Sequence, residues 1–325
     1  MKQNWLTIEE HENGKRILKK CAKEAEGEIV IPEGVSEIAD GAFKECDKIT
    51  SLVLPEGLNR IGYHAFCDRY GKESYCPALV SIHFPSNRLS APVFLSINTV
   101  LRGTAWYDNQ PNGVVYAGVN AIGYKGEMPR NTEIVIKEGT KYVSGYAFMD
   151  CFNLVSITLP ESLAYIDESA FIGCRFLKTI TFSSNVNLSG GYFMEETLWY
   201  KNQPDGIVYA GANAIGFKGK MPQKTEIVIK EGTKYITFRA FASQKNLEKV
   251  TLPQSIVKIG FEAFQYCENL KTVCIPKVCN IETVCESWLT TRDNTLSQML
   301  FRSGLQETEW VCNSYKNMFT RKTCQ

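Results

Sequence analysis

Apolar residues recur along this chain in a fixed order with a period of 23 residues. One unit begins at Pro32 and places Val, Ile, Ala-Phe, Cys, Ile and Leu-x-Leu in turn before it closes at Pro55. The same order returns from Pro160 and from Pro253. A unit of this length cannot bury its apolar side chains alone, so we expect successive units to stack and share one continuous core.

The residues that close each unit alternate between inward and outward positions. Leu52-Val53-Leu54, Ile157-Thr158-Leu159 and Val250-Thr251-Leu252 are three examples. This period of two predicts a short strand with one side in the core. Stacking such strands about 4.8 Å apart predicts a parallel sheet along one side of the molecule.

A second, longer repeat has a period of 93 residues. Residues 104–148 match residues 197–241 without a gap, with identity at 32 of 45 positions. The shared text includes WY-x-NQP-x-G-x-VYAG-x-NAIG and TEIVIKEGTKY. The chain therefore contains a duplicated module with an insert that interrupts the short repeat, at about residues 104–130 and again at 197–223. We expect each insert to form a hairpin.

The 23-residue pattern I-P-x-x-V-x-x-I-x-x-x-A-F-x-x-C-x-x-L-x-x-I-x-L-P resembles the BspA-like, or treponemal-type, leucine-rich repeat family over residues 29–276. The resemblance implies an α/β repeat solenoid, namely a right-handed leucine-rich repeat with short parallel strands, hairpin inserts and end caps. Members occur in bacteria of the gut and mouth and in some protist parasites. They are often on the cell surface, where adhesion to proteins or other cells has been proposed.

The two ends leave the repeat pattern. Residues 1–28 are predicted to form an N-terminal cap, in which Asn13-Gly14 indicates a type I′ hairpin. A single amphipathic helix through Ile17, Leu18 and Cys21 is the alternative. Residues 277–325 are predicted to be a C-terminal cap or tail, because an open solenoid end would expose its core.

Two sets of residues are candidates for ligand binding. The outward strand positions are rich in Ser and Thr, which suits hydrogen bonding to a peptide or glycan, although Thr also simply favours strands. The aromatic residues of the inserts could anchor a ligand, or they could pack each insert onto the solenoid. The candidates are Ser156, Thr158, Thr179, Thr181 and Thr251 on the strands, and Trp106, Tyr107, Tyr116, Trp199, Tyr200 and Tyr209 in the inserts.

Composition narrows the class of protein. Lys+Arg number 36 against 35 for Asp+Glu, which argues against a general nucleic-acid binder. No run approaches eighteen apolar residues, so no membrane span is predicted. The first residues also lack the apolar core of a secretion signal, so either the protein is intracellular or the chain starts after a removed signal.

Candidate chemistry is sparse. The repeated Cys position predicts buried structural thiols, and the spacing of Cys274, Cys279 and Cys285 fits a zinc site poorly. A disulfide among the C-terminal cysteines is possible in an exported protein. Lys125 follows Gly118-x4-Gly123 with an aromatic residue in between, which departs from a phosphate-binding loop. We predict no catalytic residue, metal or cofactor.

These observations favour a non-enzymatic protein that presents a repeat surface to a protein or glycan ligand at the cell surface or after secretion. The alternative is an intracellular protein-interaction scaffold of the same shape. Neither the repeat nor its composition selects the ligand.

Overall fold

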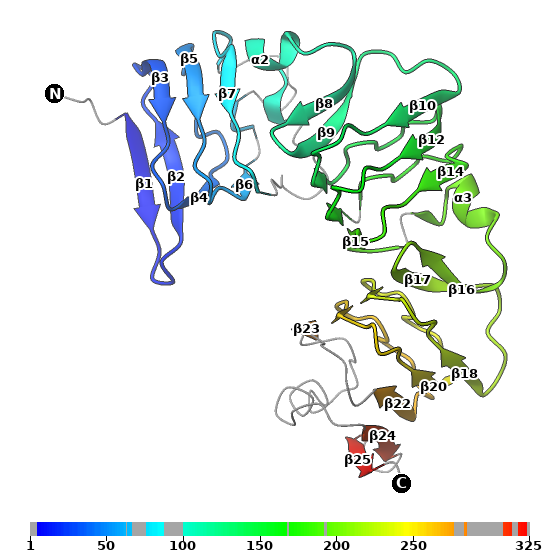
Figure 1. Cartoon of the computed structure of the whole chain (residues 1–325). Helices are drawn as coiled ribbons and strands as arrows, with labels where there is room; N and C mark the ends of the chain where they lie inside the picture. Colours follow the sequence, from blue (N-terminus) through cyan, green and yellow to red (C-terminus); the bar gives the residue numbers. More distant parts are fainter. Residues whose placement is uncertain are drawn as a thin grey trace. The chain divides into compact units, whose positions relative to one another are not determined.

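The computed structural model shows a parallel β-solenoid built from the predicted repeats (Figure 1). It describes residues 5–62, 64–66, 76–87, 100–167, 169–191 and 194–275, together with the backbone of residues 283–284, 308–313 and 318–323. The chain divides into two compact units, Met1–Cys174 and Arg175–Gln325, called unit 1 and unit 2 below.

Each regular coil contributes one strand to each of two sides. In unit 1 the longer strands β3 (Glu26–Val30), β5 (Lys48–Val53) and β7 (Ser81–His83) pair in parallel. We call this the long-strand side. The shorter strands β4 (Val35–Ile38) and β6 (Arg60–Ile61) pair in parallel on the short-strand side.

Unit 1 begins with an antiparallel hairpin of β1 (Leu6–Glu10) and β2 (Arg16–Cys21), and β2 pairs in parallel with β4. The hairpin prediction is confirmed and the helical alternative is wrong. The predicted type I′ turn is also wrong, because that turn needs positive φ at both central residues and only Gly14, at +76°, has it. The His11 N–H instead bonds the Lys15 carbonyl across a longer loop.

The rest of unit 1 holds the first insert and two further coils. The insert contains helix α2 (Ala105–Asp108) and the antiparallel strands β8 (Gly113–Ala117) and β9 (Asn120–Lys125). The coils that follow form two parallel pairs: β10 (Thr132–Val135) with β12 (Leu154–Thr158), and β11 (Tyr142–Val143) with β13 (Tyr165–Ile166).

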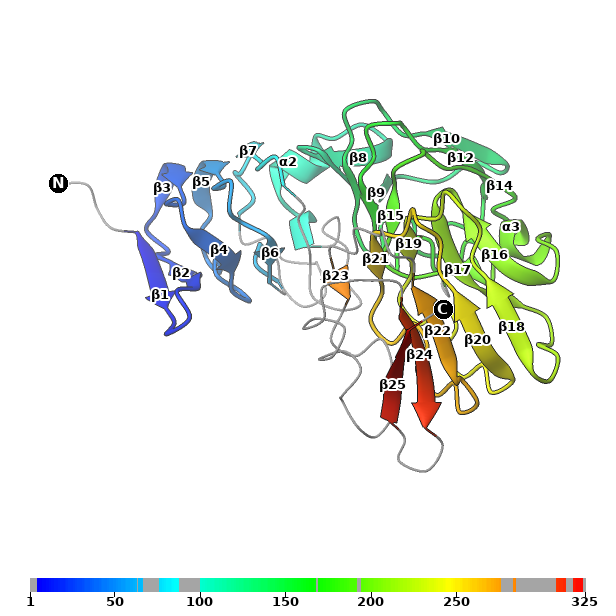
Figure 2. The ribbon, with the colours of Figure 1, turned by 60° about the horizontal axis from the view of Figure 1, so that its bottom comes forward.

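Unit 2 repeats this plan (Figure 2). It opens with β14 (Thr179–Thr181) and β15 (Asn187–Leu188). The second insert has helix α3 (Leu198–Lys201) and the hairpin of β16 (Gly206–Ala210) and β17 (Asn213–Lys218).

The remaining strands of unit 2 form two sheets, one on each side. The long-strand side comprises β18 (Thr225–Val228), β20 (Leu247–Thr251) and β22 (Thr272–Ile275), followed by the antiparallel strands β24 (Thr308–Asn313) and β25 (Met318–Thr323). The short-strand side continues from β17 through β19 (Tyr235–Ile236), β21 (Lys258–Ile259) and β23 (Thr283–Val284).

The predicted solenoid is confirmed, but its α/β character is not. The two helices whose bounds the structure describes, α2 and α3, have four residues each and lie in the inserts. The short-strand side of the regular coils is made of two- to four-residue strands and turns instead of helices. A 23-residue coil leaves little length for a helix once both strands and their turns are built.

The core is a column of the repeated apolar residues. The Phe of each Ala-Phe pair is completely or almost completely buried, and adjacent rings stack: Phe148 lies 5.5 Å from Phe171 and Phe241 lies 5.3 Å from Phe264, centroid to centroid. Leu52 and Leu54 are buried on either side of a half-exposed Val53, as the strand alternation predicted. No helix among the described residues has the length and apolar character needed to cross a membrane.

Candidate binding surfaces

The outward side chains of the long-strand side lie in register from coil to coil. In unit 1, Glu133 pairs with Ser156 and Val135 pairs with Thr158 across β10 and β12. Thr158 is exposed and Ser156 is half-buried. Parallel pairing holds such neighbours side by side, so each pair places one hydroxyl group next to a side chain of the adjacent coil.

Unit 2 presents a more highly charged version of this surface. Glu226, Lys249 and Thr272 form one row across β18, β20 and β22, and Val228, Thr251 and Cys274 form the next. The Lys249 ammonium lies 3.7 Å from the Glu226 carboxylate. Thr251 is half-buried, whereas Thr179 and Thr181 on β14 are exposed. The strand candidates are therefore at the surface in both units.

The insert helices are held by a hydrogen-bond pattern that both copies share. The buried Thr104 hydroxyl accepts a hydrogen bond from Tyr107 N–H at 3.1 Å and donates to the Leu101 carbonyl, which caps α2. Thr197 caps α3 in the same way through Tyr200. These short helices are thus fixed at their first residue in both units.

The insert tryptophans pack on the preceding coil. The backbone N–H of Trp106 donates to the Leu79 carbonyl, and the Trp106 ring meets the Phe84 ring edge-to-face, with 5.0 Å between the ring centroids. Trp106 and Tyr107 are only 9% and 7% exposed. Trp199 makes the same contacts with Leu177 and Phe182, and Trp199 and Tyr200 are half-buried.

The tyrosines of the insert hairpins bind the coil that follows. The Tyr116 hydroxyl accepts a hydrogen bond from Lys137 N–H at 3.2 Å, while the Lys137 ammonium lies 4.1 Å from the centre of the Tyr116 ring. Tyr209 and Lys230 repeat both contacts. Burial raises the pKa of Tyr116 and of Tyr209, although the hydrogen bond from the lysine backbone opposes this. Burial also raises the pKa of Tyr200 to about 12, with a further contribution from the charge of Glu195.

Two lysines that follow the insert glycines have structural partners. The Lys125 ammonium donates to the carbonyls of Tyr107, Asp108 and Gln110 at 3.1, 2.7 and 2.6 Å. Lys218 binds the equivalent carbonyls of Lys201 and Gln203. Both ammonium groups therefore bind the free carbonyls at a helix C-terminus. The lysine that follows the insert glycines thus has a structural role.

The repeated cysteines line the interior. Cys46, Cys76 and Cys174 are fully buried, as predicted, while Cys151 and Cys267 are half-buried. The Cys174 thiol donates to the Phe148 carbonyl at 2.9 Å, one coil earlier. Burial raises the pKa of Cys151 and of Cys267 to about 12, so these thiols are poor nucleophiles at neutral pH. Cys279 and Cys285, which were considered for a zinc site and for a possible disulfide, lie outside the described residues.

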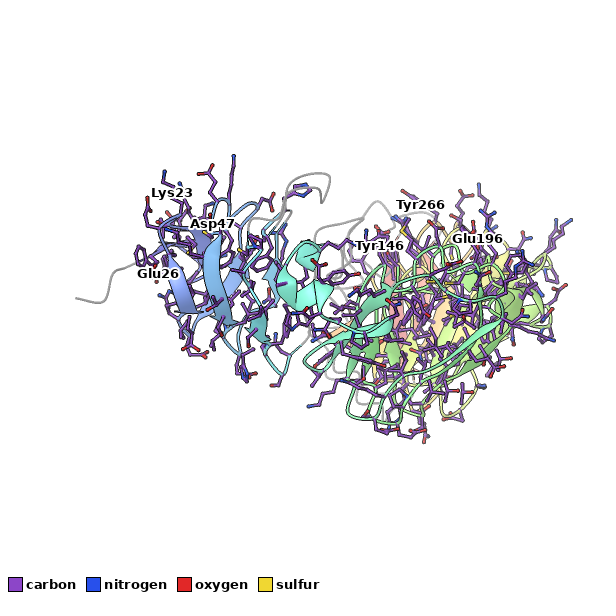
Figure 3. The ribbon with its side chains drawn as sticks, turned by 90° about the horizontal axis from the view of Figure 1, so that it is seen from above. Lys23, Glu26, Asp47, Tyr146, Glu196 and Tyr266 are labelled. Carbon is purple, nitrogen blue, oxygen red and sulfur yellow. The ribbon has the colours of Figure 1, made fainter. Side chains whose placement is uncertain are left out.

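Two surface features escaped the sequence analysis. Tyr146 and Tyr266 have positive φ, 57° and 56°, in the turns flanking Ala-Phe, and such turn positions recur in other coils. Figure 3 shows Lys23 and Tyr266 on the outside of the ribbon.

The second feature is a set of highly exposed valines on the long-strand side, Val30, Val135 and Val228. The sequence Glu-Ile-Val-Ile occurs three times, once at each of these strands, and this repetition could have identified the exposed valines.

Comparison with solved structures found matches of low similarity, among them leucine-rich repeat proteins. A leucine-rich cell surface protein from Faecalibacterium prausnitzii A2-165 is 18% identical, with a TM-score of 0.30, over 84% of this chain and 93% of the other. A leucine-rich repeat protein of T. pallidum is 19% identical, with a TM-score of 0.28, over 58% and 85%. The pneumococcal vaccine antigen PcpA is 15% identical, with a TM-score of 0.25, over 86% and 70%.

No curated protein matches the chain. A family model described as the BspA type leucine-rich repeat region matches six copies, over residues 15–92, 127–214 and 216–318. These ranges take in the 23-residue coils described above and confirm the resemblance found in the sequence. The chain belongs to the BspA-type leucine-rich repeat family.

Proposed function

We propose that the protein is a non-enzymatic binding protein that presents the long-strand side to a protein or glycan ligand. The observation that carries this proposal is the register of outward side chains across the coils, in which Ser156 lies beside Glu133 and the exposed Thr158 lies beside Val135. Stacked repeats commonly use such surfaces for recognition, because each coil adds one more copy of the same spacing. The other strand candidates are Thr179, Thr181 and Thr251 in unit 2.

The insert aromatics contribute differently to this proposal. Trp106 and Tyr107 are buried, so we propose that they stabilise the packing of the insert and do not contact a ligand. Tyr116, Trp199, Tyr200 and Tyr209 are half-buried and keep an accessible edge. We propose them as secondary contacts, subordinate to the strand row.

We also propose that both ends act as caps. The β1–β2 hairpin lies at the start of the short-strand side of unit 1, and the β24–β25 hairpin pairs with β22 at the end of the long-strand side of unit 2. Solenoid ends need such cover because the last coil otherwise exposes its core and its backbone edge.

Ligand binding is tested with the full chain on a glycan array and on an array of extracellular proteins. The variant carries Ser156→Arg and Thr158→Arg, which block the strand row of unit 1. The matched control carries Met149→Arg and Phe152→Arg, which place the same charge at exposed apolar positions outside the row. Loss of a wild-type signal in the first variant only is expected; loss in the control only would move the binding surface to the turns.

Cell-surface exposure is the second part of the proposal, with an intracellular scaffold as the alternative. Intact source cells are treated with protease, and released peptides are identified. Peptides from residues 104–241 in the supernatant are expected. Cleavage only after lysis would favour the scaffold.

A further inference from the structure

Strand β18 forms one edge of its sheet, with β20 as its neighbour on the other side. The backbone N–H groups of Thr225 and Ile229 donate to carbonyls of Asn246 and Thr251, toward β20. Successive peptide groups of a strand point to opposite edges, so the N–H and C=O groups of Glu226 and Val228 point away from β20. Within the described part of unit 2, the hydrogen bond at this outer edge is donated by the Lys230 backbone N–H and accepted by the Tyr209 hydroxyl.

The side chains at this open edge are unusual for an uncovered strand. Val228 is 68% exposed, and the Glu226 side chain is 65% exposed. Native proteins usually protect open edges with lysine, proline or a covering segment, because an exposed aliphatic edge pairs readily with another chain. Val228 is exposed next to backbone N–H and C=O groups that point away from β20. This combination indicates an edge that pairs with another strand.

The same pair of side chains recurs wherever a long-strand sheet begins. Strand β3 carries Glu28 and Val30, and β10 carries Glu133 and Val135, with the valines 56% and 73% exposed. One strand further in, the Glu-x-Val pair is not repeated. The equivalent positions hold Ser51 and Val53, Ser156 and Thr158, and Lys249 and Thr251, so Glu is replaced in all three strands and Val in two. The Glu-x-Val pair is therefore found on edge strands. A general need for solubility does not explain this, because it would act equally on the outward positions of the inner strands.

We propose that the outer edge of β18 binds an extended peptide segment as an additional strand, with Lys or Arg opposite Glu226 and a β-branched residue opposite Val228. Backbone hydrogen bonds to the groups of residues 226 and 228 supply the affinity, and the alternate side chains supply the selectivity. The edges of β3 and β10 carry the same pair and are further sites of the same kind. This inference does not depend on the ligand surface or the location proposed above.

The chain already contains a strand of the required chemistry. On the inner edge, Lys249 stands opposite Glu226 and Thr251 stands opposite Val228 in strand β20. An acidic residue placed opposite Glu226 on the outer edge would meet a like charge and weaken binding. The edge therefore selects basic extended segments and rejects acidic ones.

The test uses the full chain and a labelled, end-blocked peptide that copies residues 246–253, NLEKVTLP. Residue-resolved hydrogen exchange reports the Glu226 and Val228 amides of β18 separately from those of β3 and β10. The peptide is expected to slow exchange of these two amides, while Ile227 and Ile229 are protected with or without it. N-methylation of one alternate set of peptide amides is expected to abolish the effect, and methylation of the other set to preserve it.

Charge exchange supplies the decisive variant. Glu226→Lys is expected to raise the peptide concentration needed for protection at Val228 at least tenfold, and a peptide with Glu in place of its Lys is expected to restore binding. Glu268→Lys is the matched control, because Glu268 is also an exposed partner of a lysine but lies away from this edge. Retained protection of Ile227 and Ile229 shows that each variant is folded.

Three results would overturn the proposal. The first is unchanged protection of Val228 in Glu226→Lys. The second is peptide-induced protection that leaves residues 226 and 228 unaffected. The third is protection of both amides without peptide in a preparation that light scattering shows to be dimeric, which would make a second copy of the chain the occupant of the edge.

Discussion

The two copies of the duplicated module, residues 104–148 in unit 1 and 197–241 in unit 2, differ in an instructive way. They keep the residues that close hydrogen bonds within the insert, such as the capping threonines and the buried Asn120 and Asn213. They change the turn before Ala-Phe, where Gly145-Tyr146 becomes Phe238-Arg239. Within the inserts, these conserved residues make internal hydrogen bonds, so their identity is explained by packing and does not by itself indicate a shared ligand site.

The changed turn gives unit 2 a surface that unit 1 lacks at the equivalent place. Phe238 stacks on Phe261 at 6.1 Å, and the Arg239 guanidinium lies 5.0 Å from the Phe238 ring centre. The Arg239 side chain also pairs with Glu262 at 2.6 Å. Tyr146 and Arg239 both have positive φ, so the backbone of the turn is retained while its chemistry differs.

The largest expected effect is at the stacked phenylalanines, which the copies share. Phe148→Ala and Phe241→Ala should each lower the free energy of unfolding by about 3–5 kcal/mol, because each removes a fully buried ring from the column. Urea denaturation followed by circular dichroism measures the loss. Thr158→Ala, at an exposed outward position, is the control and should change stability by less than about 0.5 kcal/mol. Equal damage from Thr158→Ala would mean that the repeat register is wrong.

The buried asparagines should rank second. Asn213 donates to the carbonyls of Val186 and Ala210 at 2.8 and 2.9 Å and accepts from Leu188 N–H at 3.0 Å. Asn213→Ala leaves these backbone groups without partners and should cost about 2–3 kcal/mol, measured in the same way. Asn120→Ala should match it, since Asn120 binds the Asn87 and Ala117 carbonyls. A loss at one copy only would show that the two inserts are held differently.

The third effect has the opposite sign. Thr140 and Thr233 are fully buried, and their hydroxyl oxygens have no hydrogen-bond partner among the described residues. Coils without a preceding insert fill this position with apolar residues, namely Val35, Leu58, Leu163 and Ile256. Thr140→Val and Thr233→Val should therefore each raise the free energy of unfolding by about 1 kcal/mol. Thr158→Val is the exposed control, and destabilisation by Thr140→Val would reveal a hydrogen bond to bound water.

The sequence predicted those parts of the fold that depend on repetition. The 23-residue period gave the strand register, the buried phenylalanines and the burial of three of the five repeated cysteines, because every coil repeats the same order of apolar residues. It did not give the short strands opposite, since two residues such as Tyr142–Val143 are too few to show a period. Nor did it separate buried Trp106 from half-buried Trp199, because both stand in the same repeated WY-x-NQP sequence.

The smallest effect is expected where the copies differ. Arg239→Ala removes the ion pair with Glu262 and the contact with the Phe238 ring, yet the arginine side chain is 52% exposed and its charge is screened by solvent. The free energy of unfolding should fall by less than about 1 kcal/mol in a urea titration. Tyr146→Ala is the counterpart in unit 1 and should also have a small effect. A decrease in the free energy of unfolding above about 2 kcal/mol for Arg239→Ala would contradict this interpretation. The turn would then stabilise unit 2, and its difference from unit 1 would not be a change of surface chemistry alone.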